Sequence, residues 1–138
     1  MMPAGKYYVG DLCYVMTDAE WDLLHPMLFP ERQRTMVEGE HFVNGKKIAI
    51  YGTAFGDGTY TDQHVHGYDV DSGSIGCILV SDIDASEQEN IVGSGNVHDF
   101  PSGFHTSSDG SCLTFGHIEI ETDEDEWPED DEDEEEED

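Results

Sequence analysis

Hydrophobic and polar residues alternate over short stretches of this chain, and glycine-containing turns separate the stretches. An alternation with a period of two is typical of β-strands that bury one face. It predicts strands in residues 7–16 (with an interruption at Gly10 and Asp11), 35–43, 46–55, 59–62, 68–70, 74–83, 96–100 and 112–121. Residues 74–83 are apolar almost throughout, which favours a central strand buried on both faces.

Two local motifs add a helix and a hairpin. Thr17 and Glu20 have the spacing of a capping box, and an amphipathic pattern follows until Pro30. Asn44-Gly45 is a strong signal for a two-residue β-hairpin turn. With six to eight short strands and one helix, we expect an α+β, mainly β fold: a small antiparallel sandwich or open barrel with the N-terminal helix over one end.

The pattern also predicts which residues share a face of the last strand. Residues 112–121 predict one continuous strand after a turn at Asp109-Gly110. Phe115, His117 and Glu119 would then share one face. Their neighbours Gly116, Ile118 and Ile120 would share the other.

Charge divides the chain into a body and a tail. The 138 residues contain 33 acidic and 5 basic side chains, for a net charge of −28. Beyond Thr122 every residue is Asp or Glu except Trp127 and Pro128. Charges of one sign at this density repel one another and cannot bury apolar area, so such a segment does not fold alone. We therefore expect one globular domain over residues 1–121 and a disordered acidic tail over 122–138.

The same charge excludes several classes of function. Direct electrostatic binding to DNA, RNA or an anionic membrane needs a cationic face, which this chain lacks. No apolar run approaches the roughly 20 residues of a membrane span, and no signal-peptide core follows the N-terminus. We expect a cytoplasmic protein. Adaptation to high salt would also give an acidic surface.

The folded body contributes to the imbalance. Residues 48–118 contain ten acidic side chains and neither Lys nor Arg, so few of these acids can form ion pairs with residues nearby in the sequence. This pattern predicts an acidic surface for a basic, nucleic-acid-binding partner. From the body we expect it to comprise Asp57, Asp62, Asp69, Asp71, Asp82, Asp84, Glu87 and Glu89. The tail would extend it with Asp123, Glu124, Asp125, Glu126 and the aromatic anchor Trp127.

Signals for catalysis are weak. Cys13, Cys77 and Cys112 lie in apolar, strand-like contexts without a Cys-x-x-Cys spacing, which predicts buried free thiols. Phosphate-binding, dinucleotide-binding, serine-hydrolase and zinc-protease motifs are absent from the sequence. We expect no enzyme, no catalytic residues and no cofactor.

A metal site is a separate hypothesis. His64 and His66 would point to one face if they lay on a strand, and carboxylates near them could complete the site. The densest set of possible ligands is Asp62, His64, His66, Asp69 and Asp71. A polar hairpin tip with exposed histidines explains the same pattern without a metal.

Several runs in this chain resemble a family of small uncharacterised phage and bacterial proteins. They are KYYVGDLCYVM from Lys6, AIYGTAFGDGTY from Ala49, VDSG from Val70, IGC from Ile75 and LTFGHI from Leu113. The resemblance covers most of residues 6–120 but not the acidic tail. It implies a phage or mobile-element setting, in which the protein would lie in the cytoplasm of the host cell. It carries over neither an activity nor functional residues.

Three hypotheses follow. The first is an acidic protein that mimics nucleic acid and blocks a DNA- or RNA-binding protein, as a phage inhibitor of a host defence or DNA-processing system would. The second is a chaperone or docking module that binds a basic protein through residues 123–138. The third is a metal-binding module or metal-dependent enzyme centred on His64 and His66. The oligomeric state stays open.

Overall fold

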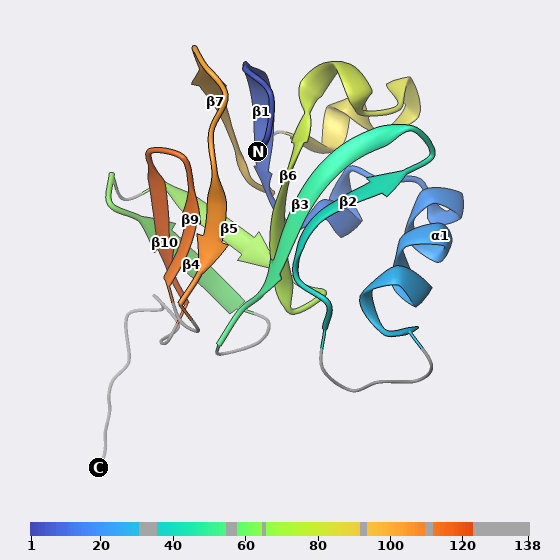
Figure 1. Cartoon of the computed structure of the whole chain (residues 1–138), viewed down its shortest axis with the longest axis horizontal. Coiled ribbons are helices and arrows are strands. Elements are labelled where there is room, and N and C mark those ends of the chain that lie inside the picture. The colour runs from blue at the N-terminus through green and yellow to red at the C-terminus, as the bar shows by residue number, and fades with distance from the viewer. Residues whose placement is uncertain (31–35, 55–57, 65, 92–93, 110–111, 123–138) are drawn as a thin grey trace.

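The computed structural model describes all residues except 31–35, 55–57, 65, 92–93, 110–111 and 123–138 (Figure 1). In the described residues the chain forms two five-stranded antiparallel sheets. The order in the first sheet is β2 (Gly39–Val43), β3 (Lys46–Gly52), β6 (Ser74–Leu79), β1 (Gly5–Gly10) and β7 (Asn96–Phe100). The order in the second sheet is β5 (Gly67–Val70), β4 (Gly58–Asp62), β10 (Ile118–Glu121), β9 (Cys112–Phe115) and β8 (Thr106–Ser108). The prediction of a mainly β antiparallel sandwich with one N-terminal helix is confirmed.

Two hydrophobic cores stack the elements into three layers (Figure 1). Between the sheets, Tyr7 and Val9 of β1 belong to the same buried cluster as Tyr60 of β4 and Ile120 of β10. The opposite face of the first sheet packs against the helix α1 (Asp18–Leu28). The helix thus covers a face of the first sheet, while the outer face of the second sheet has no layer of described residues over it.

Local sequence signals explain how these elements begin and end. The Thr17 hydroxyl accepts a hydrogen bond from the Glu20 N–H at 3.2 Å, and the Glu20 carboxylate accepts one from the Thr17 N–H at 3.0 Å. The predicted capping box is therefore confirmed. Asn44 and Gly45 have positive φ angles of 53° and 79°, as the predicted hairpin between β2 and β3 requires. The apolar strand β6 is the central strand of the first sheet, also as predicted.

Other boundaries differ from the prediction. The described residues form ten strands rather than six to eight. Strand β1 ends at Gly10, because the Asp11 carboxylate caps the short 3-10 helix η1 (Leu12–Tyr14). Two further 3-10 helices, η3 (Val80–Asp82) and η4 (Ala85–Ile91), follow β6. No helix among the described residues combines the length and the apolar character that crossing a membrane requires.

The prediction of one strand over residues 112–121 is wrong. Strands β9 and β10 form a hairpin there, and Gly116 adopts a φ of 60° in the turn between them. The buried positions run Leu113, Phe115, Ile118 and Ile120, so the alternation shifts by one residue at the turn. His117 therefore lies in the turn and does not share a strand face with Glu119.

Candidate functional site

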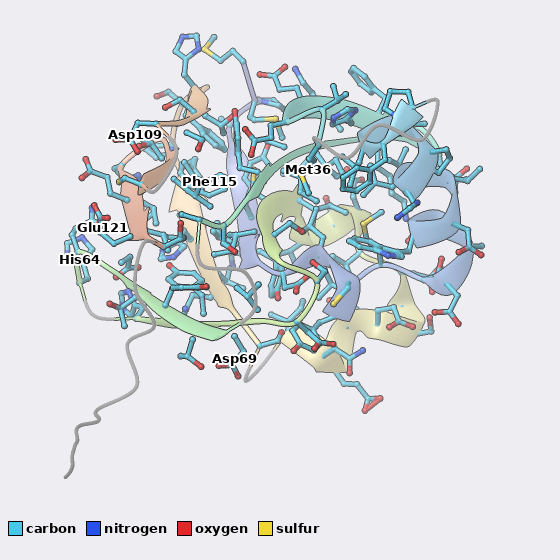
Figure 2. All side chains as sticks on the ribbon, turned by 90° about the horizontal axis from the view of Figure 1, so that it is seen from below. Met36, His64, Asp69, Asp109, Phe115 and Glu121 are labelled. Carbon is cyan, nitrogen blue, oxygen red and sulfur yellow. The ribbon has the colours of Figure 1, made fainter. Side chains whose placement is uncertain are left out.

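The outer face of the second sheet is polar and acidic. Alternate residues of its strands, such as Tyr60, Phe115 and Ile118, are buried in the core between the sheets. Their neighbours point the other way, because side chains alternate along a strand. We call this surface the open face; its residues are Thr59, Thr61, Asp69, Cys112, Thr114, Glu119 and Glu121, all exposed or half-buried. Figure 2 shows Glu121, Asp109 and Asp69 on the outside of the molecule, away from α1.

The described basic residues lie on the other sheet. The strands of the second sheet contain neither Lys nor Arg. The three described lysines are in β1 and β3 of the first sheet, where Lys46 forms an ion pair with Glu20 and Lys47 pairs with Glu40 at 3.1 Å. Two of the three described lysines are thus paired with carboxylates of the first sheet and its helix. No Lys or Arg stands among the open-face residues.

A shallow pocket on the open face shows the effect of its carboxylates. It is lined by Thr61, Asp62, Gln63, Cys112, Glu119 and Glu121. Burial raises the pKa of the Cys112 thiol, and the carboxylates of Glu121, Asp109 and Glu119 raise it further. The thiol therefore stays protonated at neutral pH, which makes it a poor nucleophile.

Gln63 connects two turns beside this pocket. Its side-chain amide donates to the His117 carbonyl oxygen at 2.6 Å and accepts from the Glu119 N–H at 2.9 Å. The turn between β4 and β5 is thereby attached to the turn between β9 and β10. The end of the open face is held by these hydrogen bonds as well as by strand pairing.

In the structure, the described acidic residues predicted to bind a partner do not form one continuous surface; they lie in several separate regions. Asp69 lies on the open face, and Asp71 lies exposed in the turn after β5. Asp82, Asp84, Glu87 and Glu89 lie in or beside η3 and η4, which follow a strand of the first sheet. Asp57 and the tail residues Asp123, Glu124, Asp125, Glu126 and Trp127 lie outside the described residues. The sequence prediction did not assign Asp109, Glu119 and Glu121 to partner binding, although the alternation of Glu119 and Glu121 with apolar residues was visible.

Asp62 is buried instead of exposed, so it contributes no contact surface. Its carboxylate accepts hydrogen bonds from the backbone N–H groups of His64 and His66 at 2.8 and 3.1 Å. The Tyr68 hydroxyl donates to it at 2.6 Å, and His66 Nδ1 lies 3.1 Å from it. Burial alone would raise the pKa of Asp62, but the hydrogen bonds from Tyr68, His66 and His64 lower it to about 2.

Four of the seven histidines gather around Asp62. The metal hypothesis placed His64 and His66 on a strand, but both lie in the turn between β4 and β5. Their ring centroids are 6.1 Å apart. His98 comes from β7 of the first sheet, 5.8 Å from the His66 ring, and His117 lies 6.4 Å beyond His98. His98 and His117 were not predicted, because only the packing of the two sheets brings them here.

Tyr68 links the two sheets within this group. Its hydroxyl donates to Asp62 and lies 2.8 Å from Nε2 of His98. Burial raises the pKa of Tyr68, and the Asp62 carboxylate raises it further. Burial lowers the pKa of His98; Asp62 opposes this effect, and His66, His117 and His64 reinforce it. At neutral pH the group therefore contains a carboxylate, a neutral phenol and a neutral His98 imidazole.

The remaining predicted ligands lie elsewhere. The Asp69 carboxylate accepts from the Thr59 hydroxyl at 3.2 Å on the open face. The Asp71 N–H donates to the Asp11 carboxylate at 2.7 Å. All three cysteines are free thiols, as predicted; Cys77 is buried, whereas Cys13 and Cys112 are partly exposed.

Comparisons with known proteins add no family or relative. No protein-family model, no curated protein and no solved structure matches the chain.

Proposed function

We propose that this protein is an acidic interaction protein that mimics nucleic acid and blocks a DNA- or RNA-binding protein, with the open face as its contact surface. One observation carries the proposal. Asp69, Glu119 and Glu121 stand on the solvent-facing side of a sheet whose strands contain no Lys or Arg. A carboxylate surface of this kind is complementary to a groove lined by Lys and Arg.

The sheet fixes the backbone positions from which these carboxylate side chains project. Glu119 and Glu121 lie on the same side of β10, about 6.6 Å apart along the strand. Ile118 and Ile120, which alternate with them, are buried in the core between the sheets. A partner groove that binds a regular row of phosphates would meet carboxylates that project from one side of a hydrogen-bonded strand.

The acidic tail follows this surface in the sequence. Strand β10 is the middle strand of the second sheet and ends at Glu121. Only Thr122 separates it from residues 123–138, of which all but Trp127 and Pro128 are acidic. We expect the tail to extend the anionic field of the open face, with Trp127 as an apolar anchor.

The proposed mechanism is electrostatic steering followed by steric blockade, with no chemical step. A strongly negative surface accelerates the approach of a cationic partner, and salt weakens this effect. Once bound, the sheet would occupy the groove that the partner needs for nucleic acid. In the phage setting that the sequence resemblance implies, the partner would be a host defence or DNA-processing protein.

Competitive elution from DNA tests the proposal. A bacterial extract is bound to immobilised duplex DNA at low salt, and the protein is then applied. We expect it to elute a basic nucleic-acid-binding protein, form a complex with it, and lose that complex to added duplex or to high salt. Polyglutamate of matched charge is the control. If polyglutamate elutes the same proteins equally well, a fixed carboxylate arrangement is not needed and the proposal fails.

The tail-docking alternative predicts a different outcome. A full-length variant in which the acidic residues of 123–138 are replaced by Asn and Gln keeps the open face unchanged. Under the proposal this variant still elutes the partner, with weakened affinity. If it loses all elution activity, the tail alone is the binding element and the protein is a docking module for a basic protein.

A further inference from the structure

The histidines around Asp62 form a cluster with the composition of a metal site, apart from the open face and independent of the proposed function. The side chains of Asp62, His66 and His98 each offer a ligand atom, and these atoms lie within 4.8 Å of one another. They come from the end of β4, the following turn and β7 of the opposite sheet. The fold therefore brings His98 next to Asp62, although the two residues are 36 positions apart in the sequence.

The spacing of the rings fits a shared ion. Two imidazoles bound to one tetrahedral zinc ion, with Zn–N bonds of about 2.0–2.1 Å, have centroids roughly 5 Å apart. The His66 and His98 centroids are 5.8 Å apart. His66 lies in a turn and its side chain is 50% exposed, so its ring can close the remaining distance without disturbing a packed strand.

The surroundings also favour a cation. The Asp62 side chain is fully buried, and within the described residues its ion-pair partner is the His66 imidazole, not a Lys or Arg. The carboxylate accepts hydrogen bonds from Tyr68 and the following turn, and a bound divalent ion would neutralise its charge. His64 and His117 stand next to His66 and His98, so either imidazole can serve as an additional ligand.

We propose that Asp62, His66 and His98 bind a divalent transition-metal ion of the zinc class. Two imidazoles and one carboxylate suit zinc, whereas the hard ions Mg²⁺ and Ca²⁺ prefer oxygen ligands alone. Tyr68 has a supporting role, because its hydroxyl contacts both Asp62 and His98 and fixes their orientation. Three protein ligands leave one tetrahedral position for His64, His117 or water.

The acidic tail complicates the measurement, since its carboxylates also attract cations. The test therefore uses the full chain, purified without a histidine tag, in excess Mg²⁺ to occupy oxygen-only sites. Zn²⁺ is titrated by calorimetry, and Co²⁺ is added separately to record its visible absorption, which is intense only in tetrahedral sites. We expect one ion per chain and a tetrahedral Co²⁺ spectrum.

Variants identify the ligands. His66→Gln and His98→Gln should each weaken Zn²⁺ binding by at least about tenfold and abolish the Co²⁺ spectrum. His25→Gln is the matched control, because His25 is an exposed histidine of α1 on the far side of the first sheet. Circular dichroism shows whether each variant is folded. The proposal is overturned if the two cluster variants bind Zn²⁺ as the control does, or if Mg²⁺ suppresses all binding.

Discussion

Asp11 and Ser72 are 61 positions apart in the sequence, yet the Asp11 carboxylate accepts hydrogen bonds from both the N–H and the hydroxyl of Ser72, at 2.6 and 2.8 Å. The same carboxylate accepts from the N–H groups of Asp71 at 2.7 Å and Cys13 at 3.0 Å. Asp11 is fully buried. This side chain therefore joins the turn between β5 and β6 to the end of β1.

We expect Asp11→Asn to lower the free energy of unfolding by about 2–3 kcal/mol, because an amide nitrogen would replace one acceptor facing buried N–H donors. Urea unfolding measures the effect. Asp22→Asn is the control, since it removes the same charge from an exposed position on α1. Equal unfolding midpoints for the two variants would contradict the bridging role of Asp11.

The hydrogen bonds to Asp62 predict a pH dependence. The pKa of Asp62 is about 2 in the folded protein, below the unfolded value of about 3.9. Ionisation of Asp62 thus stabilises the fold fully above about pH 4, and this stabilisation declines as the pH falls toward 2. The difference in unfolding free energy between the wild type and Asp62→Asn should shrink over that interval. The comparison cancels the effect of protonating the other carboxylates.

Tyr68→Phe provides a second check on the same site. Removing the hydroxyl deletes the 2.6 Å hydrogen bond that favours the ionised form of Asp62. The pKa of Asp62 should therefore rise, as carbon NMR of the carboxyl group can measure. An unchanged pKa in this variant would show that the backbone N–H groups of the turn suffice to hold the carboxylate.

Close packing around Gly76 predicts a further sensitive position. A Cβ atom at this residue would meet the Ala49 carbonyl oxygen and lie 2.8 Å from Leu12 Cδ1. Both neighbours are buried, so Gly76→Ala should destabilise the protein by about 1–3 kcal/mol in thermal unfolding. At Gly67 a Cβ meets no atom within 4 Å, and Gly67→Ala should change stability by less than about 0.5 kcal/mol. Similar losses at both positions would contradict this account of the packing.

Local sequence signals predicted those parts of the fold that short-range physics decides. The capping box at Thr17 and the turn at Asn44-Gly45 depend on residues that are neighbours in the chain. The hairpin of β9 and β10 was missed because Phe115, His117 and Glu119 occupy every second position and were assigned to one continuous strand. The change of phase between Phe115 and Ile118, with Gly116 between them, was the available signal.

The candidate site was less accessible to sequence reasoning. His64 and His66 could be selected because they are close in sequence. His98 and His117 join them only through the stacking of β7 against the second sheet and through the turn at Gly116. Asp62 was assigned to the exposed surface because nothing in its immediate sequence showed that Tyr68 and two backbone N–H groups would enclose it.

The most direct test of the proposed function removes equal charge from two regions. The triple variant Asp69→Asn, Glu119→Gln and Glu121→Gln neutralises the open face. Its matched control, Asp84→Asn, Glu87→Gln and Glu89→Gln, removes the same charge beside η3 and η4. The rate of association with the partner eluted from DNA is measured by stopped flow at low and at high salt.

The open-face variant should associate at least about tenfold more slowly at low salt and show a weaker salt dependence, whereas the control should stay close to the wild type. If both triple variants slow association equally, net charge alone drives binding, and the open face is not the surface that stands in for nucleic acid.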